Sequence, residues 1–265
     1  MVYSTGHPDP AMGPTVFARS ARRAALCALV LIFGLAPALA RDFSVYPVRV
    51  ELRPERAAET VVLSHRDDRE LRFEVSYQAW EMDEAGAWLL TDTDELLVHP
   101  LQVAVPAQGS ATIRVGFLGG ADGRQRAWRL FIQQLPDEVE TEAVQIQVLT
   151  RLSLPVFFGP ADAKPQAELV RARAEAGELR FDLGNVGSGY LGPQRLTLYL
   201  LDAAGELIES HGADVGYVLA DRRLPVAVPL AKEACARLRT VVVDVPEARQ
   251  EASASISEHD RACEP

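Results

Sequence analysis

A long alternating segment constrains the fold of this chain more than any other feature. Residues 144–160 read VQIQVLTRLSLPVFFGP, in which apolar and polar residues alternate up to Val148 and a more apolar run leads to Pro155. Alternation with a period of two is typical of a β-strand, because successive side chains point to opposite faces. The segment predicts a strand over residues 144–158, about 15 residues, where five or six are usual. We expect the excess length to pair with a neighbouring domain or with another chain.

The first 40 residues predict a signal peptide. A basic region at residues 19–23 precedes a short apolar region at residues 24–35, and Ala38-Leu39-Ala40 fits a small-residue cleavage site. The apolar region is shorter than the roughly 20 residues of a bilayer span, although a single N-terminal anchor is the alternative. Met1 and Met12 are both candidate starts. The leader predicts export to an extracytoplasmic compartment, most simply a periplasm.

Length, charge and cysteine content narrow the class of protein. Removing 40 of the 265 residues leaves 225, which is long for one sandwich and typical of two domains of about 100 residues. The mature chain then has 24 basic and 36 acidic residues, a net charge of −12. Nucleic acid is therefore excluded as an expected partner, because phosphate binding needs a basic surface. Cys235 and Cys263 form an even pair that predicts a disulfide, with two free thiols as the alternative.

The mature sequence consists of short strand-like runs separated by turn signals. Leu71–Trp80 alternates strictly and is rich in residues that favour strands. About seven such runs predict a first β-sandwich over 41–158, and the pattern resumes after a linker at 159–166 to give a second, smaller β-domain over 167–265. A helical turn is expected within 230–239. The polar tail 247–265 is expected to be held only by the disulfide.

The sequence predicts no enzyme. The histidines of the mature chain are scattered without the spacing of metal ligands, and no nucleophile motif is present. The glycine-rich segment Gly184–Gly189 follows a strand but begins no amphipathic helix, which favours a loop over a nucleotide cradle. We therefore expect no metal and no cofactor. An exported adhesive or structural binding protein and a sandwich-fold hydrolase are the alternatives to the function inferred below.

The long strand itself suggests a binding function. Val144, Ile146 and Val148 share one face of the predicted strand. They are suited either to fill an open groove of another protein, with backbone pairing along the strand edge, or to face the core of their own domain. Periodicity alone leaves both interpretations open.

Several motifs, taken in order, resemble one family. They are Val48-Arg49-Val50, Leu97-Val-His-Pro100, Ile113-Arg114-Val115, Trp128–Pro136 and Leu152–Phe157. Their order and spacing resemble the periplasmic pilus-assembly chaperones of the chaperone–usher pathway, over residues 43–160 and more weakly over the second domain. The ending of the long strand is similar to the archaic or alternative branch, which assembles thin, spore-coat-like pili.

The resemblance implies a fold and a mechanism. The fold is all-β, with two immunoglobulin-like β-sandwich domains set at an angle around a cleft. A pilin subunit lacks the last strand of its own sandwich, and the chaperone lends a strand to fill the resulting groove. Val144, Ile146 and Val148 match the donor positions. The implied partners are pilin subunits and an outer-membrane usher, and a free chain is expected to cap its exposed strand by pairing with a second copy.

The resemblance also implies a site for the carboxylate at the C-terminus of the subunit. Arg49 matches the first of two basic residues that bind this group, and a guanidinium can do so bidentately. The second, usually a lysine, falls on Ser153, so Arg151 or Arg129 is expected to substitute for it. Arg114 matches an arginine with a structural role in an ion pair.

Overall fold

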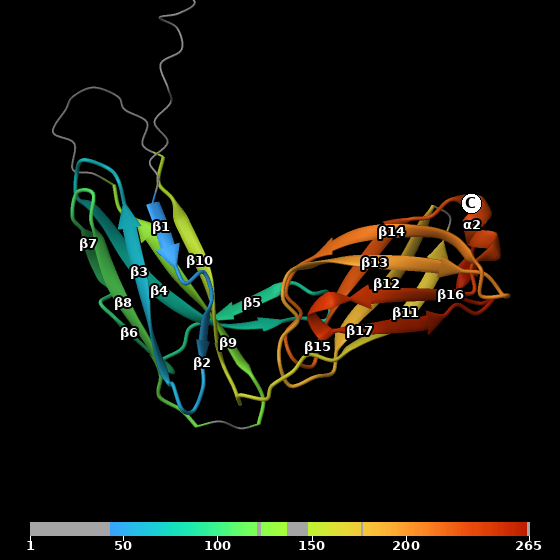
Figure 1. Cartoon of the computed structure of the whole chain (residues 1–265), viewed down its shortest axis with the longest axis horizontal. Coiled ribbons are helices and arrows are strands. Elements are labelled where there is room, and N and C mark those ends of the chain that lie inside the picture. Colours follow the sequence, from blue (N-terminus) through green and yellow to red (C-terminus); the bar gives the residue numbers. More distant parts are fainter. Residues whose placement is uncertain (1–42, 121–122, 137–147, 176, 264–265) are drawn as a thin grey trace, which may run out of the picture. The chain divides into compact units, whose positions relative to one another are not determined.

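The computed structural model describes residues 43–120, 123–136, 148–175 and 177–263, and their strands form two β-sandwiches (Figure 1). The N-terminal sandwich contains two sheets. Sheet I has the order β1 (Phe43–Tyr46), β3 (Ala58–His65), β8 (Ser110–Phe117) and β6 (Leu96–His99). Sheet II has the order β2 (Val50–Leu52), β10 (Arg151–Phe158), β9 (Arg126–Gln134), β4 (Leu71–Met82) and β5 (Trp88–Thr91), with β7 (Gln102–Val105) also pairing with β4.

The C-terminal sandwich repeats this plan with two four-stranded sheets. Sheet III has the order β15 (Arg222–Pro229), β12 (Glu178–Asn185), β11 (Ala167–Glu175) and β18 (Arg261–Ala262). Sheet IV has the order β14 (Leu207–Val215), β13 (Gln194–Leu201), β16 (Thr240–Val245) and β17 (Gln250–Ser255). The short helix α2 (Lys232–Arg237) lies within the range expected for a helical turn, and the 3-10 turn η1 (Pro246–Ala248) joins β16 to β17.

Each sandwich has its own hydrophobic core. In β4, the alternate residues Leu71, Phe73 and Val75 enter the N-terminal core with Trp128 and other buried residues of sheets I and II. A separate cluster that includes Phe181 fills the C-terminal sandwich. The predicted linker 159–166 lies between the end of β10 and the start of β11. The all-β prediction is confirmed, whereas the limits of the domains stay a prediction.

The C-terminal tail is more ordered than the sequence indicated. The predicted disulfide between Cys235 and Cys263 is present, with their Cα atoms 5.7 Å apart. However, the expectation that the disulfide alone holds residues 247–265 is wrong. β17 pairs with β16 along its whole length, from Gln250 opposite Val245 to Ser255 opposite Thr240. The sequence of β17 is polar and low in strand propensity, so it does not predict a strand. β17 forms because the open side of β16 supplies backbone hydrogen-bond partners.

The long predicted strand is shorter in the structure. β10 begins at Arg151, and residues 148–150 are not in a strand. Val144 and Ile146 lie outside the described residues. The prediction of a continuous strand from 144 to 158 is therefore wrong at 148–150, where the described residues form one backbone hydrogen bond to β9, from Gln134 to the carbonyl of Thr150, and no ladder. Within the described ranges, no helix is long and apolar enough to cross a membrane.

Candidate functional site

One edge of sheet II is open beside the predicted donor segment. β10 pairs with β9 from Arg151 to Phe158, but on its other side β2 pairs only with Val156–Phe158. The backbone N–H of Gln134 donates to the carbonyl of Thr150, so the alternation of an antiparallel ladder directs the N–H groups of Arg151 and Ser153 to the open side. Pro155 has no N–H, but at this position an N–H would point to the open side. The proline therefore removes no hydrogen bond from the pairing of β10 with β9. The stretch 151–155 thus offers unpaired backbone groups to another strand.

Val148 is the one predicted donor residue that the structure describes. Its side chain is 81% exposed, and it precedes the open edge by three residues. By contrast, Leu154 and Val156, within β10, are buried in the N-terminal core. Val148 is therefore an apolar side chain that its own sandwich leaves unburied.

Arg49 lies immediately before β2 and contacts residues from both sandwiches. Its Nε is 3.0 Å from the Oε1 of Glu51, and its guanidinium lies over the ring of Tyr190, 5.4 Å from the centroid. Burial lowers the pKa of Arg49, but Tyr190, the Glu51 carboxylate and a hydrogen bond with Tyr217 outweigh burial and raise the pKa above its ordinary value. Arg49 is a fixed cation whose side chain is still 42% exposed.

Arg129 on β9 is a buried cation without a carboxylate partner among the described residues. It is only 5% exposed, and its guanidinium stacks between Trp80 and Trp88, 4.7 and 4.3 Å from the two rings. Nε donates to the hydroxyl of Ser153 at 2.9 Å and Nη2 donates to the carbonyl of Ser153 at 3.1 Å. Nη1 is buried without a partner in the described part of the chain. Burial lowers the pKa of Arg129, and Tyr217 opposes that effect.

The other two predicted basic residues lie elsewhere on the N-terminal sandwich. Arg151 is exposed at the start of β10, and its guanidinium lies 4.2 Å from the centroid of the Phe131 ring. Arg114 is exposed on β8, where its strand neighbours are Thr60 and His99. Arg114 forms no ion pair with any residue that the structure describes, so its structural role stays a prediction.

An aromatic cluster lies between Arg49 and Arg129, and sequence reasoning missed it. Trp80 and Phe157 project from sheet II, and Tyr190 and Tyr217 come from loops of the C-terminal sandwich. The rings of Phe157 and Tyr190 are stacked, with centroids 3.9 Å apart and planes at 15°. A signal was available for Trp80: it falls out of phase with the core positions Leu71, Phe73 and Val75 of β4, so alternation places it on the opposite face. Nothing in the local sequence marks the two loop tyrosines.

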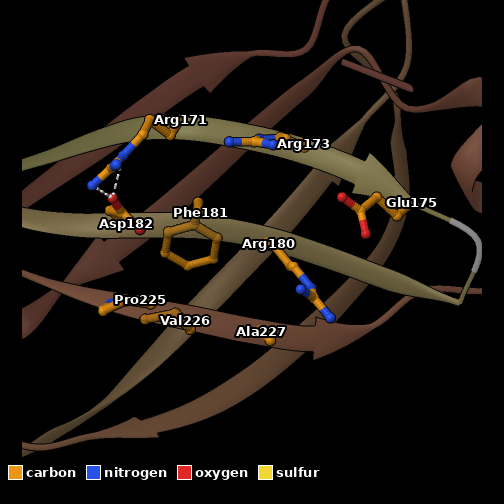
Figure 2. A pocket seen from close by; sticks show the side chains of 9 residues that line it. All are labelled: Arg171, Arg173, Glu175, Arg180, Phe181, Asp182, Pro225, Val226 and Ala227. Atoms are coloured by element: carbon orange, nitrogen blue, oxygen red, sulfur yellow. Dashed lines mark hydrogen bonds and ion pairs between the residues drawn. The ribbon is translucent and has the colours of Figure 1, made fainter. Parts of the chain in front are cut away.

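A cavity of about 350 Å³ on sheet III is separate from these residues (Figure 2). Figure 2 shows Arg171 turned towards Asp182, with Nε 2.6 Å from Oδ2, and Arg180 on the same strand as Asp182. Arg180 in turn pairs with Glu178 at 2.6 Å. The charges of this cavity are thus largely neutralised within the sheet, and none of the predicted site residues lines it. In the described part of the chain, no cluster of His, Cys, Asp and Glu is suited to hold a metal.

Sequence comparison relates part of the chain to fimbrial chaperones. No known family model matches the chain. It is 28% identical over 128 residues to the probable fimbrial chaperone EcpB of Escherichia coli O1:K1, which covers 47% of this chain and 58% of that protein. The protein of the same name from Escherichia coli O7:K1 is 27% identical over 123 residues, with 46% and 55% covered. The match thus spans less than two thirds of these curated relatives.

Solved structures extend the likeness to both sandwiches. The class 5 fimbriae chaperone CfaA has a TM-score of 0.56 at 13% identity, covering 82% of this chain and 99% of CfaA. A chain of the CsuC–CsuE chaperone–tip adhesin complex from archaic Csu pili of Acinetobacter baumannii gives 0.55 at 17% identity, covering 81% and 98%. The fold is that of the pilus chaperones. The immunoglobulin-like fold and the resemblance predicted from the sequence are therefore confirmed.

The solved complexes also record partners of the similar proteins. The Csu structure is a pre-assembly complex of a chaperone with a tip adhesion subunit. In a Salmonella enterica structure, the SafA pilin is in complex with the SafB chaperone, and the match has a TM-score of 0.53 at 14% identity, covering 82% of this chain and 97% of that one. At these identities the likeness establishes the fold, so the partners of the present chain are a separate inference.

Proposed function

We propose that this chain is a periplasmic chaperone that binds pilus subunits by donating a strand and delivers them to an outer-membrane usher. The open side of β10 at residues 151–155 carries the proposal, because it offers backbone pairing directly after an exposed apolar side chain, Val148. The similarity to fimbrial chaperones gives the partner class. The archaic branch is part of the same proposal.

The donated side chains are Val144, Ile146 and Val148. Burying each in the groove of a subunit contributes about 1.5–3 kcal/mol before the cost of ordering the segment. Backbone hydrogen bonds along 151–155 set the register, since a slip of one residue moves every side chain to the opposite face. Subunit folding supplies the driving force, so the activity requires no catalysis, cofactor or metal.

Arg49 and Arg129 are the proposed pair that binds the terminal carboxylate of the subunit. Arg129 is favoured over Arg151 because Nη1 of Arg129 has no partner in the described residues, whereas the guanidinium of Arg151 rests on Phe131. Both Arg49 and Arg129 are within electrostatic reach of Tyr217, which supports a shared site. A buried guanidinium without a counter-ion favours an anionic ligand.

The test is recovery of a subunit from periplasmic extracts with a tagged chain. The unaltered protein is expected to yield a small β-rich subunit in a one-to-one complex, identified by mass spectrometry and sized by gel filtration. Ile146→Asp places a charge among the donated side chains, and Arg49→Glu reverses the carboxylate site. Each is expected to reduce the recovered subunit at least tenfold, about 1.4 kcal/mol.

Matched controls are available on the C-terminal sandwich. Leu207→Asp changes an apolar side chain that is 57% exposed on β14, and Arg223→Glu reverses an exposed charge on β15. Both controls are expected to recover the subunit as well as the unaltered chain does. Equal recovery with Ile146→Asp and Arg49→Glu would contradict the mechanism. A free chain that elutes as a dimer, and as a monomer after Ile146→Asp, is the expected sign of self-capping.

A further inference from the structure

We propose that the C-terminal sandwich completes the carboxylate site: the hydroxyl of Tyr217 donates directly to the terminal carboxylate of the subunit, and Tyr190 positions Arg49 through Glu51. This inference rests on the proposed function and adds residues from the second sandwich to a site otherwise built on the first. A carboxylate accepts hydrogen bonds and donates none, so a complete receptor needs several converging N–H and O–H groups.

The two tyrosines are held together by backbone contacts between their loops. Leu191 and Val218, their neighbours in sequence, exchange two backbone hydrogen bonds of 2.9 and 3.0 Å. The buried side chain of Asn185 donates to the carbonyls of Gly189 and Val218 at 2.7 and 3.0 Å. The positions of Tyr190 and Tyr217 relative to each other are thus determined by the fold of the C-terminal sandwich.

Tyr217 packs between the surroundings of the two arginines. Its ring meets Trp80 edge-on, with centroids 5.4 Å apart and planes at 87°, and Trp80 lies under Arg129. Its ring also lies 5.6 Å from that of Tyr190, over which Arg49 extends. Tyr217 also contributes to the raised pKa of Arg49, and a tyrosine hydroxyl can donate one hydrogen bond to an incoming acceptor.

Two buried hydrogen-bond donors near Tyr217 have no acceptor among the described residues, which favours binding of a ligand that accepts hydrogen bonds. Nη1 of Arg129 and Nε1 of Trp80 are both buried, and neither has a partner among the described residues. Arg129 is 5% exposed and Trp80 is 1% exposed. Unsatisfied buried donors cost about 1–3 kcal/mol each, and a bound carboxylate near Tyr217 supplies the acceptor that they lack.

Tyr190 acts on Arg49 through Glu51. The hydroxyl of Tyr190 donates to Oε1 of Glu51 at 2.7 Å, and the same oxygen lies 3.0 Å from Nε of Arg49. Burial and the bond to Glu51 raise the pKa of Tyr190 well above its ordinary value, so this hydroxyl keeps its proton. Because Glu51 engages Nε, the two terminal nitrogens of the guanidinium are left to bind an incoming carboxylate side by side.

The test compares a short strand-forming peptide of alternating valine and threonine, labelled at its N-terminus, with the same peptide carrying a C-terminal amide. The readout is the ratio of acid to amide affinity, measured by fluorescence anisotropy with the full chain. Tyr217→Phe keeps the ring contacts and removes the hydroxyl. It is expected to lower this ratio about tenfold and to leave the amide affinity unchanged, because a hydrogen bond to a charged group is lost.

A second set of variants tests the positioning role. Glu51→Gln retains an acceptor for Tyr190 and is expected to keep the ratio within about twofold, whereas Tyr190→Phe and Glu51→Ala are expected to lower it about threefold. Tyr199→Phe, on β13, is the matched control and leaves the ratio unchanged.

The outcomes separate the two proposals. An unchanged ratio in Tyr217→Phe would overturn the role of Tyr217, even if subunit recovery and its dependence on Ile146 are as expected. Equal ratios in Glu51→Gln and Glu51→Ala would overturn the positioning role. Equal affinities of the unaltered chain for the acid and the amide peptide would contradict the carboxylate site itself, and with it the anchoring part of the proposed function.

Discussion

Two strands in this protein, β10 of the N-terminal sandwich and β11 of the C-terminal sandwich, each leave most of one side unpaired among the described residues, but β11 is interrupted by a bulge and β10 is not. β18 pairs with β11 only at Ala174 and Glu175. Elsewhere, β11 has a bulge between Val170 and Arg173, and Arg171 adopts a left-handed conformation with φ of 54°. Bulges and charged side chains are common devices against unwanted strand addition.

β10 has no bulge along its open side, and its only such features are the exposed Arg151 at its start and Pro155, which has no N–H to offer. Its register with β9 runs without interruption from Arg151 to Phe158, and an exposed valine precedes it. Gln250 donates to the carbonyl of Ala167 on β11 at 2.5 Å, whereas no side chain of the described residues other than Arg129 bonds to the backbone of 151–155. The contrast is consistent with the proposal that the open edge of β10 accepts a strand of a subunit.

The largest predicted effects test whether the two sandwiches are separate units. Trp128→Ala and Phe181→Ala each remove a nearly fully buried aromatic side chain from one of the two cores. Each is expected to cost about 3–5 kcal/mol in the free energy of unfolding of its own sandwich. Calorimetry should show one transition moving to lower temperature while the other stays in place. A common shift of both transitions would mean that the sandwiches unfold as one unit.

Loss of the disulfide is expected to affect only the C-terminal sandwich. Replacing both Cys235 and Cys263 by serine opens a link across 28 residues and should cost about 3 kcal/mol. Because β17 pairs fully with β16, the tail should stay protected from proteases at temperatures below the new transition. Rapid cleavage within 250–255 in the folded variant would restore the idea that the disulfide alone holds the tail.

A pair of proline variants addresses the open edge directly. Arg151→Pro removes an N–H that faces the open side, so subunit affinity is expected to fall about tenfold while the melting temperature of the N-terminal sandwich changes little. Leu152→Pro removes an N–H from the β9 ladder instead and should destabilise the sandwich. The reverse pattern, with Arg151→Pro unstable and still binding, would contradict the assignment of the open side.

The smallest effect concerns pH and the C-terminal sandwich. Backbone hydrogen bonds from Glu206, a bond from Arg237 and a bond from Ala204 lower the pKa of Asp202 in the folded state. A lowered folded pKa gives stability that is present above the unfolded value and is lost as the pH falls through the folded value. Asp202→Asn should therefore lower the melting temperature slightly at neutral pH, and the difference should shrink as the pH falls below the ordinary aspartate pKa of about 3.9. A difference that grows towards acid pH would contradict this sign.

Much of the fold follows from local pattern. Alternation from Leu71 to Tyr77 predicted β4, and the spacing of apolar runs predicted sandwiches, because alternating side chains must be divided between a core and the opposite face. The cysteine pair predicted the disulfide because an even number of cysteines in a chain that is predicted to be exported has few alternatives. By contrast, β17 has little strand propensity and forms only because β16 offers an open side.

In the candidate site, too, some residues were predicted from the sequence and others were recognised only in the structure. The sequence identified Arg49 and named Arg129 beside Arg151, but it offered no way to choose between the latter two. The proposal of Arg129 rests on the structure, since Arg129 is stacked between two tryptophans with one nitrogen unpartnered in the described residues, whereas Arg151 is exposed on Phe131. Glu51 was overlooked because its partner, Tyr190, lies 139 residues away.

Taken alone, the sequence predicted the all-β class and the disulfide, which are confirmed, and the export signal and the donated strand, which stay predictions. These depend on composition and on contacts between near neighbours, whose spacing the chain itself sets. Only the tertiary structure decided which side of β10 is left open and which tyrosines face the arginines. Those facts depend on how loops from distant parts of the sequence come together, and no local periodicity encodes that.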